Sequence, residues 1–179
     1  MLMHYWLLYL GVPVLFVIGG LMHFVYEWSG NLTLVGIIAP INESVWEHLK
    51  LAFWPIMFWW VLGYFYLRKR SRIDPIQWFI SFVTAQIVCS LFILTFFYTY
   101  TGALGIESLI LDISSLFLGL AVAHIFALHI YRFARFNFYW LATACVMLLL
   151  LIVAFTVFTF NPPQIPVFRY SLTGSYGVY

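Results

Sequence analysis

Long apolar segments alternate with short polar ones along this chain. A transmembrane helix needs about 20 consecutive, mostly apolar residues. Runs of this length predict five spanning helices, over residues 5–28, 45–67, 76–98, 106–131 and 138–160. We therefore expect an all-α membrane protein, a bundle of about five transmembrane helices within residues 1–160, followed by a Pro-rich tail outside the membrane at 161–179.

Composition places the chain in lipid and not in water. Of its 179 residues, 65% are hydrophobic and only 8% are charged, whereas soluble domains carry roughly 25% charged residues. A chain this apolar cannot cover itself with polar groups, so we expect a multi-pass protein of the cell membrane with the lipid bilayer as its solvent. The two cysteines, Cys89 and Cys145, lie inside apolar segments, where they are expected to serve packing.

The basic residues indicate how the bundle is oriented. Six of them fall in the loops after the second and fourth predicted helices: Arg68, Lys69, Arg70, Arg72, Arg132 and Arg135. Only Lys50 and Arg169 fall on the other side. Because cytoplasmic loops carry an excess of Lys and Arg, we expect the N-terminus inside and the C-terminus outside. The basic loops are too short for nucleic-acid recognition, so no nucleic-acid partner is expected.

The acidic residues gather on the opposite, outer side. They are Glu27, Glu43, Glu47, Glu107 and Asp112, with Asp74 alone on the inner side. Acidic residues contribute little to membrane topology, so their position needs another explanation. An ionisable side chain at membrane depth costs roughly 2.5–3.5 kcal/mol and requires a partner, a water-filled cavity or a function. Any chemistry is therefore expected at the outer side.

One face of the first predicted helix carries His23 and Glu27, four residues apart, with Gly19 one turn deeper. A small residue such as Gly19 allows another helix to approach closely. His23 could ligate a metal or act as a general base held by Glu27. It could equally be a histidine that hydrogen-bonds across the bundle, and the spacing leaves both interpretations open.

The densest polar segment, residues 40–50, leads into the second predicted helix. Ser44 and Glu47 fit a capping box at its start, which leaves Glu43 and His48 unexplained. Two carboxylates and an imidazole this close together could bind a divalent metal or transfer protons. The segment lacks the HExxH spacing that places two histidines on one helix face.

Asp112 is the deepest acidic residue, about 9 Å below the outer start of the fourth predicted helix at 1.5 Å per residue. It could ligate a metal or orient a histidine, or it could be a buried carboxylate satisfied by Ser115 and Arg169. His124 lies roughly 18 Å deeper than Asp112. His124 and His129 are therefore expected to be packing or interface residues.

A longer motif resembles a known family. The run Pro40-Ile41-Asn42-Glu43-Ser44-Val45-Trp46-Glu47-His48, followed by Phe53 and Pro55, is similar to the signature stretch of a family of small polytopic membrane proteins from Gram-positive bacteria. The tail stretches Pro162-Pro163-Gln164-Ile165-Pro166-Val167-Phe168 and Thr173-Gly174-Ser175-Tyr176-Gly177, and His23 with Tyr26, also resemble it. Arg169 stands where the family's tail often carries an acid, so a catalytic carboxylate from the tail is not implied. The family is a domain of unknown function, so the resemblance implies a fold and no activity.

Three hypotheses about function follow. The first is a metal-dependent hydrolase, with an outward-facing zinc site closed over by the tail, acting on a lipid or lipid-linked substrate. Its expected metal ligands are His23, Glu27, His48 and Asp112, and its expected catalytic carboxylates are Glu43, Glu47 and Asp112. The second is a protein that binds or transports a cation or small solute. The third is a non-catalytic membrane subunit, and the sequence does not decide whether the protein is an enzyme.

Overall fold

Apolar segments separated by capping residues, glycines and prolines fold into five long helices and several short ones. The computed structural model describes residues 2–169 and 174–177, so Thr173 of the tail motif lies outside the described residues. In chain order the elements are α1 (Leu2–His4), the π-helix η1 (Tyr5–Leu10), α2 (Gly11–Trp28), the 3-10 helix η2 (Val35–Ile37), α3 (Val45–His48), α4 (Lys50–Leu67), α5 (Pro75–Leu104), α6 (Leu109–Phe133), α7 (Phe138–Phe160) and the 3-10 helix η3 (Pro166–Phe168).

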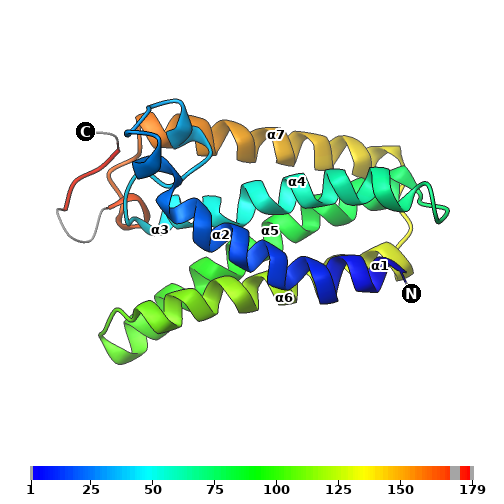
Figure 1. Ribbon diagram of the computed structural model, residues 1–179, viewed down its shortest axis with the longest axis horizontal. Helices are drawn as coiled ribbons and strands as arrows, with labels where there is room; N and C mark the ends of the chain where they lie inside the picture. Colours follow the sequence, from blue (N-terminus) through cyan, green and yellow to red (C-terminus); the bar gives the residue numbers. More distant parts are fainter. Residues whose placement is uncertain (1, 170–173, 178–179) are drawn as a thin grey trace.

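The predicted all-α bundle of about five helices is confirmed. Among the described residues, four segments are long and apolar enough to cross a membrane: Tyr5–Trp28, Pro75–Leu104, Leu109–Phe133 and Phe138–Phe160. The fifth long helix, α4, has 18 residues and runs along the bundle beside the others (Figure 1). Its first seven residues, from Lys50 to Ile56, are buried. The predicted second span is thus divided into α3 and α4.

Local sequence explains where the helices begin and end. Asp74 caps α5, because its Oδ1 accepts hydrogen bonds from two backbone N–H groups of the first turn. Pro75 follows at a position where a missing N–H costs nothing. At the other end Gly105 adopts a left-handed conformation with φ 66°, which terminates a helix readily. Gly102 stays helical, so α5 continues beyond the predicted end near residue 98 and stops only at Gly105.

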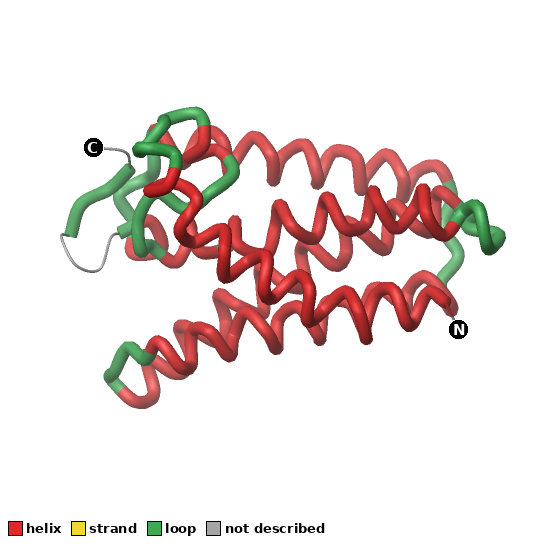
Figure 2. Tube along the Cα trace, viewed as in Figure 1, coloured by secondary structure: helices red, strands yellow, loops and turns green. Residues whose placement is uncertain are grey.

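Two groups of connections lie at opposite ends of the bundle (Figure 1, Figure 2). One end holds α1, the basic α4–α5 loop and the α6–α7 loop. The other end holds the segment between α2 and α3, α3 itself and the described part of the tail. The described ends of the chain therefore lie at opposite ends of the bundle, as an odd number of long helices running end to end requires. The end that faces the cytoplasm stays a prediction.

The helices α2 and α4 are in close contact at Gly19. A Cβ atom built on Gly19 would lie 2.6 Å from the Leu51 carbonyl oxygen, so a glycine hydrogen faces this oxygen. Pro55 lies four residues after Leu51 inside α4 and has no N–H to bond that carbonyl. The freed carbonyl faces the glycine Cα of α2, an arrangement that is typical of weak Cα–H···O contacts between packed helices. The predicted close approach at Gly19 is confirmed, and it brings His23, one turn closer to the end of α2, beside α3.

Candidate metal centre

The short helix α3 is built by the polar sequence motif. Ser44 is its N-cap, and Ser44 Oγ accepts a hydrogen bond from the Glu47 N–H at 3.3 Å. Only this half of the predicted capping box forms, because the Ser44 N–H donates to Asn42 Oδ1 at 2.9 Å and not to Glu47. The Glu47 side chain turns inward instead, and Glu47 is only 2% exposed.

A buried ion pair holds this segment in place. Lys50 Nζ donates to Glu47 Oε2 at 2.6 Å, to the Gly36 carbonyl at 2.7 Å and to Thr159 Oγ1 at 2.6 Å. An ammonium group has three donors, and these acceptors use all of them. Glu47 Oε2 also accepts from the Ile41 N–H at 3.0 Å. The pair therefore joins α3 and α4 to the preceding loop and to α7.

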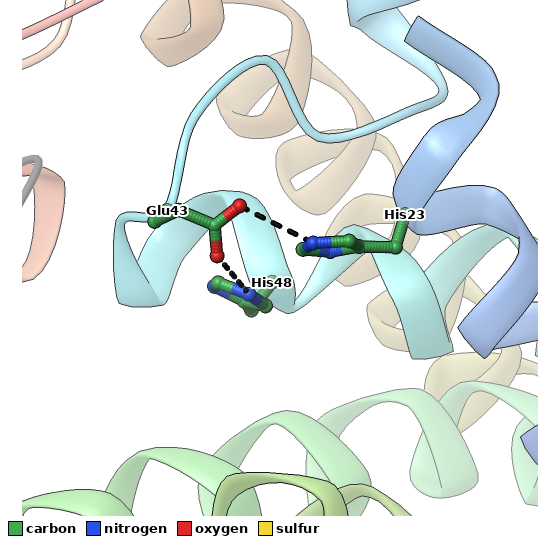
Figure 3. A group of neighbouring side chains, drawn as sticks. All are labelled: His23, Glu43 and His48. Atoms are coloured by element: carbon green, nitrogen blue, oxygen red, sulfur yellow. Dashed lines mark ion pairs between the residues drawn. The ribbon is translucent and has the colours of Figure 1, made fainter. Parts of the chain in front are cut away.

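Glu43 lies between two imidazoles that come from different helices (Figure 3). His23 belongs to α2, and His48 is the last residue of α3. Glu43 Oε1 is 3.2 Å from His23 Nε2, and Glu43 Oε2 is 3.2 Å from His48 Nε2. The two imidazole rings are stacked with their centroids 5.5 Å apart. One ligand atom from each residue lies within 4.8 Å of the other two, so this group could hold a metal ion.

The second ring nitrogen of His48 limits what can lie between it and Glu43. His48 Nδ1 is 2.9 Å from the Ser44 carbonyl oxygen, which can only accept, so Nδ1 carries the hydrogen. In a neutral His48 the lone pair of Nε2 would then face a carboxylate oxygen. Two acceptors at this distance repel each other, so a proton or a metal ion is needed between them. A backbone carbonyl on the far nitrogen is also the usual support of a metal-binding histidine.

The group is partly open to its surroundings. The side chains of His23, His48 and Glu43 are 32%, 31% and 42% exposed. Hydrogen bonds from His23 and His48 hold the pKa of the Glu43 carboxyl well below its usual range, although partial burial acts in the opposite direction. Glu43 is therefore ionised at neutral pH, which is the state that a metal ligand requires.

A small pocket of about 140 Å³ opens beside the group. It is lined by His23, Phe24, Tyr26, Glu27, Pro40, Ile41, Asn42 and Glu43.

The described part of the tail lies against residues 40–50, which we call the motif segment. Asn42 Nδ2 donates to the Gly177 carbonyl at 3.4 Å, and the rings of Phe168 and Trp46 pack with centroids 4.9 Å apart. The tail therefore braces the segment that carries Glu43 and His48.

Comparison with known protein families gives a match that includes residues 40–50. A family model described as a family of unknown function, DUF6512, matches residues 2–178. The chain belongs to the DUF6512 family. The resemblance to a domain-of-unknown-function family is thereby confirmed. No curated protein and no solved structure matches the chain.

The DUF6512 structure brings some of the predicted site residues together. His23 and His48, both predicted metal ligands, share the group, and its third member is Glu43, which was predicted as a catalytic carboxylate. Glu27, the third predicted ligand, is exposed and lines the same pocket as His23 and Glu43. Sequence spacing alone did not assign Glu43 to the histidines, because it lies in a loop outside any helical periodicity.

Asp112, the fourth predicted ligand, is not a member of this group. Its Oδ1 accepts a hydrogen bond from the Tyr100 hydroxyl at 2.7 Å, so a tyrosine of α5 is the partner that sequence reasoning missed. Ser115, the expected partner, donates to the Asp112 backbone carbonyl at 2.7 Å and not to its carboxylate. The Asp112 charge nevertheless acts on His48 across the space between α6 and α3.

Two further predicted residues have structural contacts. The Glu47 carboxylate forms an ion pair with Lys50. In the sequence, only the spacing of three residues between them indicates this pair. His124 is fully buried, with Nε2 accepting from Trp60 Nε1 at 3.2 Å and Nδ1 2.8 Å from the Leu120 carbonyl. The predicted packing role of His124 is confirmed.

Proposed function

We propose that this DUF6512 protein binds a divalent metal ion, zinc, through His23, Glu43 and His48. The ion would activate water for the hydrolysis of a lipid or lipid-linked substrate at the outer face of the membrane. One observation carries the proposal: both Nε2 atoms converge on a single carboxylate, while Nδ1 of His48 is held by a backbone carbonyl.

The spacing and the donor types suit zinc. Bonds of about 2.0–2.2 Å in tetrahedral geometry place neighbouring donor atoms roughly 3.3 Å apart. The two nitrogen–oxygen distances are both 3.2 Å but involve different oxygens of Glu43. One ligand atom from each residue lies within 4.8 Å of the other two, so the side chains would close in around the ion by up to about 1.5 Å. Two histidines and one glutamate leave a fourth position for water, as in catalytic zinc sites, whereas structural sites are closed by four protein ligands.

The remaining acidic residues take different roles in this proposal. Glu27 is the candidate general base, because it lines the same pocket as two of the ligands. Asp112 acts on His48 through its charge from α6. Glu47 is assigned a structural role, because its carboxylate neutralises the buried Lys50.

Metal analysis of purified protein tests the proposal. We expect about one zinc ion per chain, and we expect the His23→Ala and His48→Ala variants to lose it. The matched control is His129→Ala, because His129 is exposed on α6 and its ring contacts Phe133. Glu27→Gln should keep the zinc ion and lose hydrolysis. A native protein that takes up no zinc, with equal metal content in all variants, would refute the proposal.

A non-catalytic role predicts a different result for the same variants. If a proton and not a metal lies between His48 and Glu43, the three side chains form an ionic link between α2 and the motif segment. The His48→Ala variant would then lower the unfolding temperature to the same extent with and without a zinc chelator. Under the metal proposal the chelator destabilises the native protein and leaves His48→Ala unchanged.

A further inference from the structure

A groove between α2 and α6 lies on the lipid-facing surface of the bundle. It has a volume of about 350 Å³ and is lined by Phe16 of α2 and by Ile113, Ser114, Phe117 and Leu118 of α6. Ile113, Phe117 and Leu118 are 47%, 42% and 42% exposed. In a bilayer these side chains meet hydrocarbon, so the groove is open to the acyl chains of lipids.

The outer end of the groove reaches the level of the candidate metal centre. Gly19 of α2 and Leu116 of α6 lie at one level, because a Cβ on Gly19 would be 3.3 Å from Leu116 Cδ2. At 1.5 Å per residue, Ile113 lies about 4.5 Å further out than this level and His23 about 6 Å further out. Asp112 directly precedes Ile113 in α6. The groove therefore ends at a depth similar to that of His23 on α2 and directly beside Asp112 on α6.

We propose that the groove holds one acyl chain of the substrate and presents the carbonyl group of its ester or amide bond to the His23–Glu43–His48 group. This inference rests on the proposed function and specifies its substrate. The occupant is an acyl chain because the groove lining is apolar, apart from a serine whose hydroxyl already donates to the Ile110 carbonyl at 2.6 Å. The substrate would enter sideways from the bilayer, since that is the side on which the groove is exposed.

The charges around the site select the rest of the substrate. Among the described residues, no lysine or arginine lines the pocket beside the group. The nearby Lys50 is fully buried and all its donors are used. Glu27, Glu43 and Asp112 together would outweigh the charge of a divalent ion. Phosphate recognition relies on Arg or Lys. The exposed Arg169 lies in the tail after η3 and does not line the pocket, so we expect a headgroup that is uncharged or cationic and contains no phosphate.

The proposed hydrolysis consumes only the substrate and one water molecule. The oxygen of water adds to the carbonyl carbon, and the bond from that carbon to the ester oxygen or amide nitrogen breaks. The fatty acid leaves, and the proton lost by water ends on the alcohol or amine that departs.

Fluorogenic esters test the inference on the full chain, reconstituted in neutral lipid vesicles with zinc. Three probes are compared: the dodecanoyl ester of an uncharged alcohol, the acetyl ester of that alcohol, and the dodecanoyl ester of an alcohol that carries a phosphate group. Ser114→Trp fills the groove. Thr143→Trp is the matched control, because Thr143 is exposed on α7 and its hydroxyl also donates to a carbonyl four residues earlier.

We expect Ser114→Trp to lower the ratio of kcat/KM for the dodecanoyl ester to that for the acetyl ester by about tenfold or more, the effect of overfilling a packed site. Thr143→Trp should leave this ratio unchanged, and the native protein should cleave the phosphate-bearing ester at least about tenfold more slowly than the uncharged one. An unchanged ratio in Ser114→Trp, or equal cleavage of the charged and uncharged esters, overturns the inference and leaves the hydrolase proposal standing. If the zinc-loaded native protein cleaves neither uncharged ester, both proposals fail.

Discussion

Replacement of Gly19 by alanine tests whether the packing of α2 on α4 creates the metal centre. The new Cβ would lie 2.6 Å from the Leu51 carbonyl oxygen, whereas ordinary contacts begin at 3.4 Å. The obstacle is backbone and not a side chain, so it cannot rotate away. The two helices must therefore separate by about 0.8 Å, the difference between these distances.

The consequence of this separation can be worked out at the site. His23 lies one turn beyond Gly19 on α2 and moves with it, while His48 and Glu43 belong to the segment that leads into α4. Metal sites require donor distances within about 0.2 Å of their preferred values. A shift of about 0.8 Å in the helix that carries His23 adds to the closing movement that the three side chains already need to reach those values. We expect zinc affinity to fall by about 10- to 100-fold or more, and overpacking to cost about 1–3 kcal/mol in stability.

Chelator competition gives the zinc Kd, and thermal unfolding gives the stability of each variant. The control is Gly20→Ala, because a Cβ on the neighbouring Gly20 meets no atom within 4 Å. Gly20→Ala should bind zinc as the native protein does. If Gly19→Ala is folded and also binds zinc with native affinity, helix packing at Gly19 does not set the ligand geometry and the reasoning is wrong.

Two further predictions concern the charges of the motif segment. Lys50→Met leaves the buried Glu47 without its partner and should cost about 3–5 kcal/mol of stability; the double variant Lys50→Met with Glu47→Gln should recover part of this in thermal unfolding, and no recovery would contradict the pairing. The Glu43 carboxyl has a lower pKa in the folded protein than in the unfolded chain. It therefore stabilises the fold at pH values above the unfolded pKa of about 4.3, and this contribution is lost as the pH falls from there toward the folded pKa. The unfolding temperature of the metal-free protein should therefore decrease below about pH 5, and this part of the decrease should be absent from Glu43→Gln.

Much of the architecture could be predicted from the sequence. Apolar runs are long enough to identify the spanning helices because the thickness of the bilayer fixes their length. The predicted segments 5–28 and 138–160 coincide with the spans Tyr5–Trp28 and Phe138–Phe160. The cap at Ser44 and the close approach at Gly19 were also predictable, since both depend on local chemistry at a helix start or on one helix face.

The composition of the candidate site was decided by tertiary structure. Periodicity placed His23 and Glu27 on one face of a helix, yet the partner of His23 is Glu43, which reaches it from a loop. Asp112 and His23 lie at similar depth, but depth carries no information about the direction around a bundle, and the carboxylate of Asp112 turns to Tyr100. The buried Lys50 joins residues as distant in sequence as Gly36 and Thr159. The sequence by itself determined which segments lie in lipid and which polar residues lie near one end, because those properties depend on each segment alone. Which of these residues touch was decided only when separate helices and a loop packed together.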